Sequence, residues 1–143
     1  MKKVIIILFL ININTIRSQS LENLKKSDTI YILFDHGKSQ EKFFEGSINP
    51  FYTFFFHNSI YKQFRFKHPI TENYERITKQ NVFLKNEKNK IIDGNFFSKY
   101  NTTELLDFFD NNRILYIIDT DDFVDNNIIL KKVIFESTFE RGQ

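Results

Sequence analysis

Four carboxylates stand close together near the end of the chain, at Asp119, Asp121, Asp122 and Asp125. They follow a continuous apolar run, which is typical of a strand, so we expect them at the end of that strand. Hard divalent cations such as calcium take oxygen ligands in loops of this kind. The sequence therefore predicts a divalent-cation site formed by these four residues. The alternative is a solvated loop whose aspartates have turn and capping roles.

The spacing within this loop does not match an EF-hand. An EF-hand places carboxylates or amides at alternate positions and then a glycine. Counting from Asp119, the fifth position is Phe123, and no glycine follows it in the loop. The cation prediction therefore rests on the density of carboxylates and on their place after a strand.

A hydrophobic strand followed by Asp119-Thr120-Asp121 superficially resembles the nucleophile loop of haloacid-dehalogenase-type phosphatases. In that family the motif opens the fold, and a lysine and further acids come much later in the chain. Here the resemblance covers under ten residues, and about twenty residues follow it. We therefore reject this assignment, and no family is identified from the residues.

Histidine is the second candidate for chemistry, and the chain has three, at His36, His57 and His68. His36 follows Asp35 at the end of an apolar run, where it can pair with a carboxylate and act as a base. The alternative is a loop histidine without a special role. In the hairpin predicted below, His57 and His68 lie roughly 25–30 Å apart, at about 3.3 Å per residue. These two histidines are therefore not expected to share a metal.

The residue types that are missing exclude several kinds of site. The chain has no cysteine, which excludes disulfides, thiolate metal sites and a cysteine nucleophile. It has four glycines and no Gly-x-Ser-x-Gly sequence, which argues against a serine hydrolase and against phosphate-binding glycine-rich loops. No organic cofactor is expected, and the divalent cation is the one cofactor that the sequence suggests.

The first residues have the pattern of an export signal. A Met-Lys-Lys start precedes Val4–Ile11, an apolar segment that is too short to span a bilayer. We predict a signal peptide at residues 1–19 and one exported globular domain at residues 20–143. This domain is expected to be soluble, periplasmic or extracellular, and without a membrane span. The alternative for the first segment is a buried strand.

Removal of this segment changes the net charge of the protein. The whole chain has 20 basic and 18 acidic residues and a formal net charge of +2. Lys2, Lys3 and Arg17 lie within the first 19 residues, which leaves 17 basic and 18 acidic residues and a net charge of −1. No nucleic-acid partner is therefore expected.

The elements that must position these residues are mainly strands. Thr29–Phe34 and Arg113–Ile118 are continuous apolar runs, which is typical of strands covered on both faces. Asn101 and Glu104 form a capping-box sequence before an apolar stripe, which predicts a helix over about residues 101–110. Further strands are expected at residues 75–84, 91–92 and 128–135, and a loop or short helical turn at residues 38–46.

An aromatic hairpin is predicted from Phe51–Phe56 and Tyr61–Lys67, with Asn58-Ser59 as a two-residue turn. In that register one face is the better core candidate, and it carries Phe51, Phe55, Phe64 and Phe66. The other face is aromatic but also cationic, with Tyr52, Phe54, Phe56, Tyr61, Arg65 and Lys67. This second face is either part of the core or a stacking surface for a base, sugar or peptide.

Short connections between successive strands favour antiparallel pairing. We therefore predict an α+β fold, with an antiparallel twisted sheet or partial barrel and the late helix packed on it. The alternative is a βαβ crossover through that helix, between Ile91-Ile92 and Ile114–Ile118.

Three functions follow from these patterns, and they stay open at this point. The first is a small exported, non-catalytic domain that binds a protein partner or an apolar ligand, because catalytic motifs are missing and both hairpin faces are aromatic. The second is a metal-dependent hydrolytic enzyme that uses the Asp119–Asp125 loop with Asp35 and His36, which requires the ends of the two apolar strands to be neighbours. The third is a structural component of the cell envelope.

Overall fold

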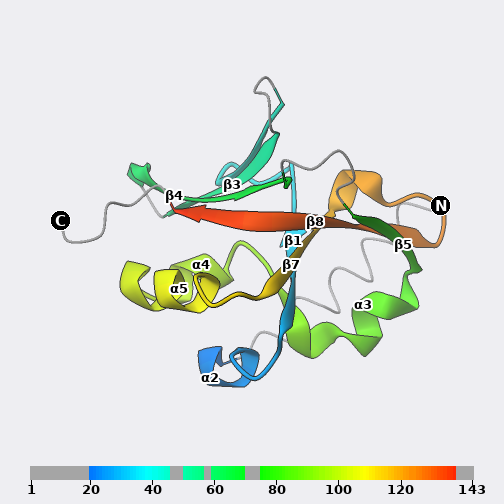
Figure 1. Cartoon of the computed structure of the whole chain (residues 1–143). Coiled ribbons are helices and arrows are strands. Elements are labelled where there is room, and N and C mark those ends of the chain that lie inside the picture. The colour runs from blue at the N-terminus through cyan, green and yellow to red at the C-terminus, as the bar shows by residue number, and fades with distance from the viewer. Residues whose placement is uncertain (1–19, 46–49, 57–58, 70–74, 138–143) are drawn as a thin grey trace.

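A computed structural model of the chain describes residues 20–45, 50–56, 59–69 and 75–137 (Figure 1). The predicted signal peptide and His57 lie outside these residues, so the predictions made for them stay predictions. Among the helices that are described, none combines the length and the apolar character needed to cross a bilayer. Along the chain the elements are α2 (Leu21–Leu24), β1 (Thr29–Phe34), β2 (Glu41–Phe44), β3 (Phe51–Phe56), β4 (Ser59–Lys67), β5 (Arg76–Gln80), α3 (Val82–Asn86), η1 (Lys88–Lys90), β6 (Ile91–Ile92), α4 (Phe96–Lys99), α5 (Thr102–Phe109), β7 (Ile114–Asp119), η2 (Thr120–Asp122) and β8 (Asn127–Ser137).

The strands form one mixed, twisted, open sheet of eight strands in the order β2-β3-β4-β8-β7-β1-β6, with β5 also paired to β8. Most of the neighbouring pairs are antiparallel, as the sequence predicts. The long strand β8 joins the two halves, because its first residues pair with β5, its middle residues pair with β7 and its last residues pair with β4. Figure 1 shows β8 running along the molecule, with β5 beside one end and β4 beside the other.

The purely antiparallel sheet is a wrong prediction for β1, which pairs in parallel with both β6 and β7. Parallel neighbours need a long connection, and the chain between β1 and β7 supplies one that contains the aromatic hairpin and several helices. The segment with α4 and α5 connects β6 to β7, which are parallel to each other but separated by β1. This part of the sheet therefore contains a crossover connection that passes over one strand.

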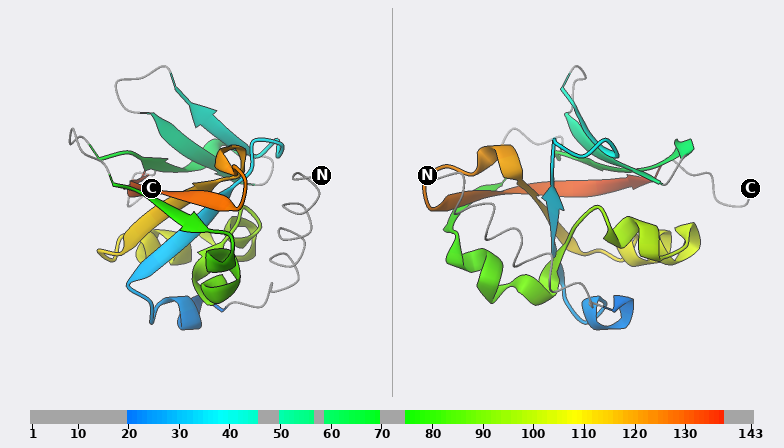
Figure 2. Two further views of the ribbon diagram at one scale, coloured as in Figure 1. Left: turned by 90° about the vertical axis from the view of Figure 1, so that its right-hand side faces the viewer. Right: turned by 180° about the vertical axis from the view of Figure 1, so that it is seen from behind.

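The central strands are covered on both faces, as their continuous apolar sequences predict. On β1, Ile30 and Ile32 belong to a buried cluster that includes residues of α4 and α5. Leu33 belongs to a second buried cluster, together with Leu84 of α3. Figure 2 shows α3 on one side of β1 and α4 and α5 on the other.

Aromatic rings fill the larger of these clusters. Phe97 of α4 stacks on Phe54 of β3, with ring centroids 4.6 Å apart. Phe109 of α5 lies 5.2 Å from Phe66 of β4 and 5.7 Å from Phe97. A chain with 18 phenylalanines and no cysteine therefore gains much of its burial from aromatic packing.

The helix α5 begins where the capping-box sequence predicts. The Asn101 side chain accepts a hydrogen bond from the Glu104 amide at 2.9 Å, and the Glu104 side chain accepts one from the Asn101 amide at 3.0 Å. The predicted strand at residues 75–84 is wrong in its second half, because β5 ends at Gln80 and Val82–Asn86 is the helix α3. The last residue of β5, Gln80, pairs with Asn127, which is the first residue of β8. Residues after Gln80 therefore have no residue of β8 to pair with, and the strand ends.

The register of the aromatic hairpin differs by one residue from the predicted one. Phe54 pairs with Phe64 and Tyr52 pairs with Phe66, and a bulge between Phe55 and Phe56 shifts the register next to the turn. Because side chains alternate along a strand, a shift of one residue exchanges the two faces of β3 relative to β4. The buried face consists of Tyr52, Phe54, Phe64 and Phe66.

The opposite face of this hairpin mixes aromatic rings with cations. Phe51 stacks on Phe44 of β2 with ring centroids 4.9 Å apart, and the Arg65 guanidinium lies 4.8 Å from the Phe51 centroid. Lys42 is placed over Phe55 at 5.7 Å. Residues 41–44, expected as part of a loop or helical turn, form the edge strand β2, because they pair with β3.

Candidate functional site

The carboxyl-terminal ends of β1, β6 and β7 meet at one edge of the sheet, because the three strands are parallel. Phe34 at the end of β1 pairs with Asp119 at the end of β7. The residues that follow each strand are therefore neighbours in space. Ligands of sheets with parallel strands bind preferentially at such carboxyl-terminal ends.

Asp119 is the most buried of the predicted acidic residues and is held by its own loop. It is 5% exposed. Its Oδ1 atom accepts a hydrogen bond from the Asp121 amide at 2.9 Å, which caps the short helix η2. The other oxygen, Oδ2, lies 2.8 Å from Nε2 of His36. The loop therefore fixes the direction in which Asp119 faces His36.

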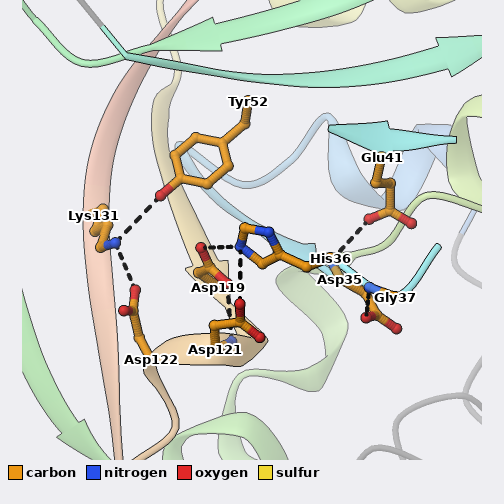
Figure 3. A network of polar contacts seen from close by, with 9 residues as sticks. All are labelled: Asp35, His36, Gly37, Glu41, Tyr52, Asp119, Asp121, Asp122 and Lys131. Carbon is orange, nitrogen blue, oxygen red and sulfur yellow. Dashed lines mark hydrogen bonds and ion pairs between the residues drawn. The ribbon is translucent and has the colours of Figure 1, made fainter. Parts of the chain in front are cut away.

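Asp121 completes a group of three around the same imidazole nitrogen. Its Oδ2 atom lies 3.6 Å from Nε2 of His36, and the potential ligand atoms of His36, Asp119 and Asp121 all lie within 4.8 Å of one another. The Asp121 side chain is 69% exposed and the His36 side chain 34% exposed, so the group opens to solvent. Figure 3 shows the two aspartates on one side of the imidazole.

The turn after β1 holds His36 in this position. The Gly37 amide donates to Oδ1 of Asp35 at 2.8 Å, and the Asp35 amide donates to Oε1 of Glu41 at 3.1 Å. The imidazole ring of His36 lies edge-to-face against Phe34, with centroids 4.7 Å apart. Both the backbone and the ring of His36 are therefore supported by neighbouring groups.

The group has the dimensions of a metal site with nitrogen and oxygen ligands. Two ligands about 2.0–2.2 Å from one ion, at angles near 90–110°, lie about 2.8–3.6 Å apart. The two distances from His36 Nε2 to the aspartate oxygens are 2.8 Å and 3.6 Å. An imidazole with carboxylates suits zinc, manganese or iron better than calcium or magnesium. Without a metal, the same contacts make a histidine–carboxylate pair that can accept or deliver a proton.

The other two predicted aspartates lie in different surroundings. Asp122 forms an ion pair with Lys131 of β8 at 2.6 Å, and Lys131 also donates to the Tyr52 hydroxyl at 3.3 Å. Asp125 occupies the turn before β8 with a positive φ of 56°. Of the four predicted cation ligands, the structure thus places Asp119 and Asp121 together with His36.

His68 is buried at the end of β4 and lies against Tyr52, with ring centroids 5.9 Å apart. Burial lowers the pKa of His68, and the nearby cations Lys131 and Arg76 lower it further, whereas a backbone hydrogen bond with Lys132 acts in the opposite direction. These surroundings favour the neutral imidazole. The predicted distance between His68 and His57 involves a residue outside the described part of the chain.

Sequence reasoning did not single out Glu41, a buried carboxyl at the same edge of the sheet. Burial raises the pKa of Glu41 to about 7, and the carboxylates of Asp35 and Asp93 add to this rise. The hydrogen bond from the Asp35 amide and the charge of Lys38 act in the opposite direction. In the sequence, Glu41 lies among charged residues that are typical of an exposed loop, so the sequence carries no signal for its burial.

Comparisons with known proteins do not indicate a function for this chain, so a proposal must start from the site itself. No protein family model, no curated protein and no solved structure matches the chain at a significant level.

Proposed function

We propose that the protein binds a divalent transition-metal ion through His36, Asp119 and Asp121, and that the bound ion acts as a Lewis acid in hydrolysis. The observation that carries this proposal is the convergence of one imidazole nitrogen and two carboxylates within 4.8 Å, from residues 83 positions apart in the chain. It modifies the metal site expected from the sequence, since a histidine replaces Asp122 and Asp125 as a ligand.

The proposal is supported by how differently the three ligands are exposed. Asp119 is buried and doubly hydrogen-bonded, so it supplies a fixed anchor, whereas the Asp121 side chain is 69% exposed. Three protein ligands leave a position for water in a four-coordinate zinc site. An ion held there by His36, Asp119 and Asp121 would lower the pKa of a bound water to near neutral and so supply a nucleophile for hydrolysis. This arrangement is typical of catalytic rather than structural metal sites.

The test is a calorimetric titration of the chelator-treated protein with Zn²⁺, Mn²⁺, Mg²⁺ and Ca²⁺. We expect one ion per chain, with Zn²⁺ and Mn²⁺ bound more tightly than Mg²⁺ and Ca²⁺ because of the imidazole ligand. His36→Gln and Asp119→Asn should each weaken Zn²⁺ binding by roughly 100-fold or more, since even outer-shell partners of a metal contribute about 10–100-fold.

Asp125→Asn is the matched control, because it removes a carboxylate from the same loop but outside the group of three. The control variant should bind Zn²⁺ like the unmodified protein. Equal loss of affinity in Asp125→Asn and Asp119→Asn would contradict the proposed ligand set. Hydrolysis of p-nitrophenyl esters and phosphates, compared with and without Zn²⁺, then tests the catalytic part of the proposal.

A second candidate is the non-catalytic binding domain expected from the sequence. The observation that favours it is the outer face of the hairpin, where Phe51 lies between Phe44 and the Arg65 guanidinium. Exposed aromatic and arginine side chains are common in the centres of protein interfaces. Under this candidate, Arg65→Ala abolishes partner capture and His36→Gln leaves it unchanged. Under the metal proposal, His36→Gln abolishes metal binding and hydrolysis and Arg65→Ala leaves both unchanged.

A further inference from the structure

A pocket of about 250 Å³ lies between the β1–β2 connection, β3 and the start of α4. Its walls combine apolar and charged groups, from Lys38, Glu41, Phe54, Phe55, Gly94 and Asn95. This volume is slightly below the range of about 300–1,000 Å³ that is usual for drug-sized ligands. The pocket therefore suits a small molecule.

Glu41 supplies a buried carboxyl to this pocket. Its side chain is 2% exposed. The Oε1 atom accepts a hydrogen bond from the Asp35 amide at 3.1 Å, whereas Oε2 lies 4.0 Å from the Lys38 ammonium, beyond hydrogen-bond range. In Figure 3 the Glu41 carboxyl points toward the turn that carries His36. A buried carboxylate is costly unless it is paired and hydrogen-bonded, so Oε2 offers a strong acceptor to a ligand.

Gly94 lies against the Oε2 side of the Glu41 carboxyl. A Cβ atom at this position would lie 2.6 Å from Oε2 and 3.0 Å from the carboxyl carbon of Glu41. The Glu41 carboxyl thus occupies the space that a side chain at position 94 would fill, and any other residue there would displace it. Gly94 and Asn95 follow β6 and line the pocket, so the pocket lies at the same edge of the sheet as the proposed metal site.

The charges around Glu41 favour a positively charged ligand. Asp35 and Asp93 both act on Glu41 as negative charges, and Lys38 is the positive charge that opposes them. The Lys38 side chain is 41% exposed, so solvent screens part of its charge. Phe54 and Phe55 of β3 add apolar lining to the pocket.

We propose that this pocket binds a small organic cation whose ammonium or guanidinium group donates to Oε2 of Glu41 and whose apolar part lies against the apolar lining of the pocket. The apolar part of the lining favours an organic cation over a metal ion, and no imidazole of the described residues lines the pocket beside its carboxyl. This binding site is separate from the group of His36, Asp119 and Asp121, so the inference does not depend on the proposed metal.

Binding of such a cation should displace a proton. Because the pKa of Glu41 is raised to about 7, a large share of the free protein carries a proton on this carboxyl at pH 6.5. An ammonium group stabilises the ionised carboxylate, so its binding releases that proton. Heats of binding should therefore differ between buffers with different ionisation enthalpies.

The test is a titration of the ¹⁵N-labelled protein with n-butylammonium, followed by amide chemical shifts, with n-butanol as the uncharged probe. We expect n-butylammonium to shift the amides of Asp35, Gly94 and Asn95 with a dissociation constant on the order of a millimolar, since the probe has few atoms. The shifts caused by n-butanol should be much smaller. Equal binding of the two probes would overturn the proposal.

Two variants with opposite expected effects separate a ligand contact from a structural role. Glu41→Gln keeps the shape of the side chain and should weaken n-butylammonium binding by about tenfold or more, because a charge-assisted hydrogen bond is lost. Lys38→Met removes the competing ammonium and should strengthen binding by a few-fold. Glu45→Gln, at an exposed carboxyl after β2, is the control and should leave binding unchanged.

The proposal is overturned if Glu41→Gln binds n-butylammonium as tightly as the unmodified protein, or if Lys38→Met weakens the binding. All titrations are made with a metal chelator and repeated in His36→Gln. Organic-cation binding that persists there supports the pocket even if the metal centre fails its own test. Binding that is lost in His36→Gln would contradict the separation of the two sites.

Discussion

Asp119 and Glu41 are two buried carboxyl groups at the same edge of one sheet, and they differ in the groups that contact their oxygens. Asp119 has an imidazole nitrogen at 2.8 Å and a backbone amide at 2.9 Å, one on each oxygen. Glu41 has an amide at 3.1 Å on one oxygen and an ammonium 4.0 Å from the other. The comparison shows that burial alone does not describe a carboxyl, because the cost of burying it depends on the hydrogen-bond partners of its two oxygens.

The largest effect is expected for Glu41→Gln, measured as the free energy of unfolding against pH. The folded state raises the pKa of Glu41 from 4.5 to about 7, so it binds a proton more tightly than the unfolded chain. The contribution of Glu41 to stability should therefore fall as the pH rises from about 4.5 to about 7, by about 3 kcal/mol in total. Glu41→Gln should remove this fall.

Urea unfolding of both proteins at pH 4 and pH 8 checks this expectation. The variant should be more stable than the unmodified protein at pH 8 and similar to it at pH 4. The opposite order at pH 8 would mean that the ionised carboxylate is stabilised in the fold, and the contrast with Asp119 would disappear.

Asp119→Ala is expected to have the next largest effect, a loss of roughly 2 kcal/mol in the free energy of unfolding at pH 7 without metal. The substitution removes the cap of η2 and leaves His36 without its nearest carboxylate. The measurement is urea unfolding in the presence of a chelator. A stability equal to that of the unmodified protein would show that Asp119 is not stabilised by its partners.

Gly94→Ala should destabilise the protein by about 1–2 kcal/mol, because the new methyl group overlaps the Glu41 carboxyl and forces it to move. The double variant with Glu41→Ala provides the control. If the carboxyl is the obstacle, Gly94→Ala should cost much less in the Glu41→Ala background. Additive effects in this double-mutant cycle would place the strain elsewhere.

Lys131→Met extends the comparison of Asp119 and Glu41 to a third carboxyl, that of Asp122. Loss of the ion pair with Asp122 and of the hydrogen bond to Tyr52 should lower the free energy of unfolding by about 1 kcal/mol. Zn²⁺ affinity should not change, because Asp122 lies outside the proposed ligand set. A large change in Zn²⁺ affinity would instead indicate that Asp122 contributes to the metal centre.

The sequence by itself determined the local features of this protein. The reciprocal hydrogen bonds of Asn101 and Glu104 form within four residues, so the start of α5 follows from the residue types alone. The continuous apolar runs of β1 and β7 also identified two strands covered on both faces, because each needs apolar residues at consecutive positions.

Tertiary structure alone decided the pairings on which the candidate site depends. The parallel register of Phe34 with Asp119 brings His36 to an aspartate 83 positions away, and no local pattern encodes that contact. The bulge in β3 exchanged the predicted faces of the hairpin, since one residue of register inverts the side-chain alternation. Burial of Glu41 likewise depends on Gly94, a residue from a distant segment. Local hydrogen bonds are determined by neighbouring residues, whereas pairing and burial depend on segments that meet only when the chain folds.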